Sequence, residues 1–97
     1  MKQKTVPQLL NQSAKTYAER NAVYGDTYKM HGDVVQALFP DGIEIDNKDD
    51  HNRFAILTMI IGKLTRYSVN FYEGGHQDSI HDISVYAAML EELDNEQ

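Results

Sequence analysis

The chain has 97 residues, no cysteine and a formal net charge of −6. This length predicts one domain, residues 1–97, with a helical core over residues 5–93, and the lack of cysteine excludes disulfides, thiolate catalysis and cysteine-ligated zinc. An acidic chain without a cluster of Lys and Arg argues against DNA or RNA as a partner, because affinity for nucleic acids comes largely from cations that neutralise phosphates.

The same features indicate where the protein works. Residues 1–4 are followed by no apolar stretch, so we expect no signal peptide. The longest apolar run, residues 54–61, is too short to span a bilayer. We therefore expect a cytoplasmic protein with no membrane partner. Because a chain of this length buries only about two-thirds of its surface, we also expect a homo-oligomer.

Two helices are predicted in the first half of the chain. The first covers residues 6–21, with Thr5 as N-cap and Pro7 in the first turn, where proline is tolerated. The second covers residues 26–38 and is weakened by Gly32. Apolar side chains recur at helical spacing in both segments, namely Leu9, Leu10, Ala14, Tyr17 and Ala18, then Tyr28, Met30, Val34, Val35 and Leu38.

The second half predicts an antiparallel helical hairpin. Residues 43–45 are expected to form an extended connector, and residues 46–50 a polar loop that ends in candidate caps. The third helix, residues 50–70, has the strongest apolar periodicity, and Gly74-Gly75 separates it from a fourth helix over residues 78–93, which Asp78 is expected to cap. The predicted fold is an all-α, four-helix bundle-like domain.

Two polar stripes flank the seam of this hairpin. Lys63, Arg66 and Asn70 share one face of the third helix, and Asp78, Asp82 and Tyr86 share one face of the fourth. With the hairpin centred on Gly74, Arg66 lies at the height of Asp82. One interpretation is a structural salt bridge between these two residues, with Tyr86 donating a hydrogen bond. The other is a ligand site in which the bases hold phosphate oxygens and the acids hold Mg²⁺, a sugar or a base edge.

The connecting loop has two readings as well. Gly74-Gly75-His76 leads into a helix N-terminus, whose backbone N–H groups favour anions, but the glycines also fit a C-cap and a turn. Tyr67, Phe71 and Tyr72 near this loop can stack on a base or, for the first two, belong to the core. The four histidines show no metal-binding spacing, and no nucleophile elbow, Walker loop or GxGxxG motif is present.

Several short motifs together suggest a family. They are Tyr24-Gly25-Asp26 after the first helix, Lys63-Leu64-x-Arg66-Tyr67 in the third, and His76-x-Asp78-Ser79-x-x-Asp82-x-x-x-Tyr86-Ala87 after the loop. Over residues 24–93 they resemble a phage-encoded family of small helical domains of unknown function, which in turn looks like a distant relative of the MazG-type all-α nucleotide pyrophosphohydrolases. The resemblance implies a site that includes Tyr24 and His76.

The sequence also departs from the MazG pattern. Those enzymes bind Mg²⁺ through an ExxE pair and an ExxD pair and hydrolyse nucleoside triphosphates. Asp78 and Asp82 are plausible counterparts of the second pair and the candidate metal ligands, but Lys63 and Arg66 stand where the first pair is expected. This replacement argues against metal-assisted hydrolysis and is compatible with binding of a nucleotide.

Three functions are therefore open. The first is a phage protein that binds a nucleotide or a nucleotide-derived signal and sequesters it to counter host immunity. The second is a Mg²⁺-dependent pyrophosphohydrolase using Asp78 and Asp82, with further acids such as Asp26, Asp33 or Glu73. The third is an acidic inhibitor that binds a host protein.

Overall fold

The computed structural model describes residues 3–96. Within this range the chain forms α-helices and short 3₁₀ turns and no strand, which confirms the all-α class. In chain order the elements are α1 (Val6–Tyr24), η1 (Thr27–Lys29), α2 (His31–Leu38), α3 (Lys48–Val69), η2 (Phe71–Glu73) and α4 (Gln77–Asn95). None of these helices combines the length and the apolar character that a membrane crossing requires.

Helix α1 begins as predicted and ends later. Thr5 Oγ1 accepts a hydrogen bond from the backbone N–H of Gln8, and the Gln8 side chain accepts one from the backbone N–H of Thr5, so the first turn carries a capping box. The helix continues past residue 21 to Tyr24. It ends at Gly25, whose φ of +63° suits glycine and whose N–H donates to the Asn21 carbonyl at 2.8 Å.

The second predicted helix is shorter than expected. Residues 27–29 form the 3₁₀ turn η1, in which Lys29 N–H donates to the Asp26 carbonyl and Met30 N–H to that of Thr27. The α-helical part starts only at His31. The reason is that the Asp26 side chain accepts hydrogen bonds from Asn21 and Lys29 instead of capping a helix.

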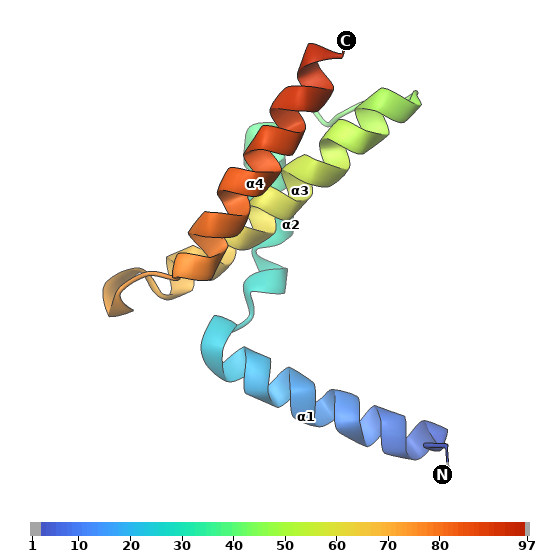
Figure 1. Ribbon diagram of the computed structural model, residues 1–97, viewed down its shortest axis with the longest axis vertical. Coiled ribbons are helices and arrows are strands. Elements are labelled where there is room, and N and C mark those ends of the chain that lie inside the picture. Colours follow the sequence, from blue (N-terminus) through green and yellow to red (C-terminus); the bar gives the residue numbers. More distant parts are fainter. Residues whose placement is uncertain (1–2, 97) are drawn as a thin grey trace.

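Helices α3 and α4 form the predicted antiparallel hairpin and pack side by side (Figure 1). Helix α3 begins two residues before the predicted start, because Asn47 rather than Asp50 is its N-cap. The turn needs both glycines: Gly74 lies in the left-handed region at φ +94°, and a Cβ on Gly75 would lie 2.8 Å from the Tyr67 ring. The loop is centred on Glu73 rather than Gly74, which changes the register of the two helices.

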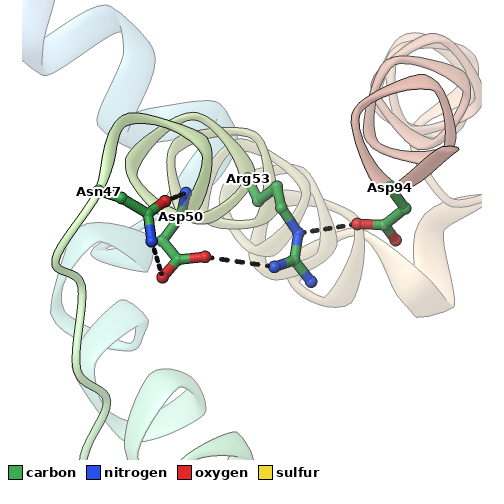
Figure 2. Close-up of polar contacts among 4 residues, drawn as sticks. All are labelled: Asn47, Asp50, Arg53 and Asp94. Carbon is green, nitrogen blue, oxygen red and sulfur yellow. Dashed lines mark hydrogen bonds and ion pairs between the residues drawn. The ribbon is translucent and has the colours of Figure 1, made fainter. Parts of the chain in front are cut away.

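A charged clamp joins the open end of the hairpin (Figure 2). Arg53 on α3 donates from Nε to the Asp94 carboxylate on α4 at 2.8 Å, and its second nitrogen lies 3.4 Å from Asp50. Asp50 in turn accepts from the Asn47 side chain at 3.1 Å. The clamp therefore connects the first turns of α3 to the last turns of α4.

Helix α1 stands apart from the other helices (Figure 1). It extends away from the hairpin, and the helices that pack together are α2, α3 and α4. The bundle-like expectation is therefore met by three helices, while the predicted apolar stripe of α1 is exposed along its length. Among residues 3–96 the one fully enclosed apolar side chain is Ile61, with the small residues Thr65 and Ser79 buried on α3 and α4.

Candidate functional site

Three predicted site residues meet where α1, α3 and α4 approach one another. Tyr24 is the last residue of α1, Arg66 lies in the last turn of α3, and His76 directly precedes α4. The Arg66 guanidinium carbon is 4.8 Å from the centroid of the Tyr24 ring, within the range of a cation–π interaction. The His76 ring meets the same tyrosine edge-on at 5.5 Å. The structure thus brings together residues that are 52 positions apart.

His76 has a defined orientation. Its Nδ1 accepts a hydrogen bond from the Ser79 backbone N–H and lies 2.6 Å from the Ser79 hydroxyl, so His76 and not Asp78 is the N-cap of α4. An accepting Nδ1 places the proton of the neutral ring on Nε2. The imidazole is consequently held against Tyr24 by its contacts with Ser79.

Lys63, and not Arg66, forms the predicted ion pair with Asp82. The Lys63 Nζ is 2.9 Å from the Asp82 carboxylate. The prediction was wrong because the loop is centred one residue earlier than expected, which moves the register of the hairpin, and because Arg66 is directed toward Tyr24. The hydrogen bond from Lys63 lowers the pKa of Asp82 below its ordinary value, with smaller contributions from the charges of His81 and Arg66.

The remaining predicted site residues have local positions. The Asn70 side chain donates to the Arg66 carbonyl at 3.1 Å, and the Asn70 backbone carbonyl accepts hydrogen bonds from the N–H groups of Glu73 and Gly75, so this residue closes the turn. Asp78 is exposed in the first turn of α4, where a carboxylate complements the helix dipole. Tyr86 is half-buried one turn after Asp82. These observations favour the C-cap and turn interpretation of the loop over an anion site.

The aromatic residues near the turn do not form a core. Phe71 is 58% exposed and Tyr72 is 95% exposed, and their rings pack edge-on against each other at 5.1 Å. Tyr67 contacts Phe71 in the same way at 6.2 Å and fills the space beside Gly75. The expected core role holds only in part for Tyr67 and not for Phe71.

A groove of about 620 Å³ runs along the inner side of α1 to the Tyr24–Arg66 pair. This volume lies in the range of small-molecule sites. The lining contains two arginines, three tyrosines and several amide or hydroxyl side chains but no carboxylate. Its polar and aromatic members include Tyr17, Arg20, Asn21, Tyr24, Tyr28 and Arg66.

A hydrogen-bond network shapes one wall of this groove. The Asn21 amide donates to the Asp26 carboxylate at 2.7 Å and to the Tyr17 hydroxyl at 3.3 Å. The neighbouring Tyr28 raises the pKa of Tyr17, mainly through a side-chain hydrogen bond and to a smaller extent through its charge. Sequence reasoning assigned Tyr17 to the apolar stripe and missed Asn21. The signal was present, since Tyr17, Asn21 and Tyr24 are spaced i, i+4, i+7.

The candidate metal ligands do not converge. In residues 3–96 no group of three His, Asp or Glu side chains is arranged to hold a metal ion. Asp82 is paired with Lys63, and Asp26 is bonded to Asn21 and Lys29. In comparisons with known proteins, no family model, no curated protein and no solved structure matched the chain.

The Lys63–Asp82 pair predicts a specific response to acid. Because the folded pKa of Asp82 is lowered, its contribution to stability is present above the unfolded pKa of about 3.9 and is lost as the pH falls through the lower folded value. The difference in free energy of unfolding between the wild type and Asp82→Asn should therefore shrink between pH 6 and pH 3, measured by urea denaturation. A constant difference would show that the pair does not titrate as described.

Proposed function

We propose that the protein binds a phosphorylated, nucleotide-like small molecule in the groove between α1 and Arg66. The supporting observation is the composition of this groove: in a chain of net charge −6 it has two arginines, three tyrosines and no carboxylate. Arginine guanidinium groups match phosphate oxygens in bidentate geometry, and tyrosine rings offer faces on which a base can stack. Arg66 and Arg20 would hold the phosphates, and Tyr17, Tyr24 or Tyr28 the base.

The proposal is binding without turnover. Hydrolysis of a nucleoside triphosphate by the MazG chemistry requires a cluster of acids around Mg²⁺. Asp82, one of the two candidate ligands, is engaged by Lys63 at 2.9 Å, and the groove has no acid in its lining. These features favour a protein that holds its ligand intact.

The resemblance to the phage family extends the proposal to a biological setting. We propose a phage-encoded protein, active in the cytoplasm of the infected cell, that sequesters a nucleotide signal of the host defence. A sequestering protein needs to be abundant and to bind tightly but does not need to catalyse a reaction. We also propose that it acts as a homo-oligomer, because a single chain encloses so few apolar side chains.

Native mass spectrometry of the protein purified from cells tests this function. We expect a small molecule at a fixed ratio to the subunits, released intact by denaturation and carrying phosphate. Protein purified empty is then titrated with ATP, cyclic AMP and ADP-ribose. Absence of a released molecule together with no binding of these three probes would refute the proposal.

The same sample separates the two alternatives. Turnover of ATP with Mg²⁺ that is abolished in Asp82→Asn would favour the pyrophosphohydrolase. A stoichiometric host protein in the purified complex, with no small molecule, would favour the acidic inhibitor.

A further inference from the structure

We propose that α1 packs on a second copy of this chain through an apolar stripe on its N-terminal half. The inference rests on the proposed homo-oligomer and assigns the surface that forms it. The α1 stripe consists of Val6, Leu10 and Ala14, whose spacing of i, i+4 and i+8 places them on one side of the helix. Val6 is 68% exposed and Leu10 65%.

In the part of the chain that the structure describes, no side chain of α1 is buried. In proteins most of the stability of a helix comes from tertiary packing of its apolar face, because helix nucleation is costly. The capping box stabilises the first turn of α1. The helix has no acidic residue in its first turn and no basic residue in its last turn that would complement the helix dipole. Its tertiary contacts are at the C-terminal end, where Tyr24 meets Arg66 and His76. The N-terminal half therefore needs a partner surface.

The exposed area has the size that a dimer would cover. The chain exposes 7705 Å², whereas a compact monomer of 11.1 kDa exposes about 5,700 Å². Its radius of gyration is 17.0 Å, against about 12.5 Å for a compact domain of this length. The excess, about 2,000 Å² per chain, is larger than the roughly 800 Å² that each partner buries in a stable interface of standard size.

A second copy fits this surface because the chain also exposes apolar side chains on its hairpin. Met59 lies one turn before Lys63 on α3, and Val85 and Met89 follow Asp82 on α4 by one and two turns, so they flank the ion pair. Each is between 42% and 45% exposed. Each copy has one α1 stripe and one apolar hairpin surface. A symmetric arrangement of two copies can therefore cover both kinds of surface without a further protein.

The test compares two substitutions in the same turn of α1. Leu10→Glu places a charge on the α1 stripe, whereas Asn11→Glu places the same residue on a different face of the helix, outside the stripe, at an exposed position. Each protein is freed of small molecules by refolding, and its mass is measured by light scattering over a series of concentrations. We expect the wild type and Asn11→Glu to have a multiple of the chain mass. Leu10→Glu should have the mass of one chain, with a dissociation constant raised by about tenfold or more.

The outcomes distinguish the surface from the oligomer itself. A wild type that is monomeric throughout would overturn both the self-association and the assigned surface. A wild type and a Leu10→Glu variant with the same multiple mass would overturn the surface alone. Since no ligand is present, none of these results depends on nucleotide binding, and circular dichroism of both variants verifies that the helices remain.

Discussion

Arg66→Ala is expected to weaken binding of the phosphorylated ligand by about 10- to 150-fold. The guanidinium group lines the groove and stacks on Tyr24, and a hydrogen bond between charged groups contributes about 1.5–3 kcal/mol. Titration calorimetry with the ligand released from the native protein measures the change. Arg66→Lys should have an intermediate effect, because lysine keeps the charge but loses the planar fork and the stacking.

Arg53→Ala is the matched control for this experiment. It is the same substitution in the same helix, but Arg53 bridges Asp50 and Asp94 at the other end of the hairpin (Figure 2). We expect an unchanged dissociation constant and a small loss of stability, since exposed ion pairs contribute about 0–1 kcal/mol. If Arg66→Ala lowers stability and leaves affinity unchanged, its role is to hold Tyr24 and not to bind the ligand.

Ile61→Ala is expected to cause the largest loss of stability, about 2–5 kcal/mol. Ile61 on α3 is 1% exposed, so its truncation leaves a cavity in the core. Because a chain of 97 residues has a small total stability, this loss is a large fraction of the whole. Urea denaturation followed by circular dichroism measures it.

Leu64→Ala shows whether the effect of Ile61→Ala comes from burial. Leu64 is on the same helix and 48% exposed, so its truncation should cost much less than that of Ile61. Equal losses in the two variants would mean that burial does not set the loss of stability. The comparison is made at one protein concentration, because self-association adds to the apparent stability.

The sequence predicted the helices well because their signals are local. The Thr5 cap, the apolar period of α3 and the double glycine each act within a few residues, and each was found where expected. The placement of α1 was not predictable in the same way. An apolar stripe shows that a helix face is to be covered, but it does not show whether the cover comes from the same chain or another.

The site was predicted in part for the same reason. The polar stripes identified Arg66, and the resemblance added Tyr24 and His76; these three residues lie together, but the ion pair with Asp82 was assigned to Arg66 instead of Lys63. A hairpin register depends on the conformation of every loop residue, and the η2 turn between Asn70 and Gly74 has no distinctive sequence signal. Arg20 lines the groove because the chain turns at Gly25, directly after α1, and no local pattern gives the direction of that turn.

The position of Tyr24 has a consequence for how the two ends of the protein communicate. This residue is at once the final residue of α1 and the ring that Arg66 and His76 contact. Helix α1, about 28 Å long, therefore has its C-terminal end fixed at the groove by these two contacts. A ligand in the groove that holds Tyr24 in place would also fix the direction of α1. By thermodynamic reciprocity, if a bound ligand raises the affinity between subunits by some factor, subunit association raises the affinity for the ligand by the same factor.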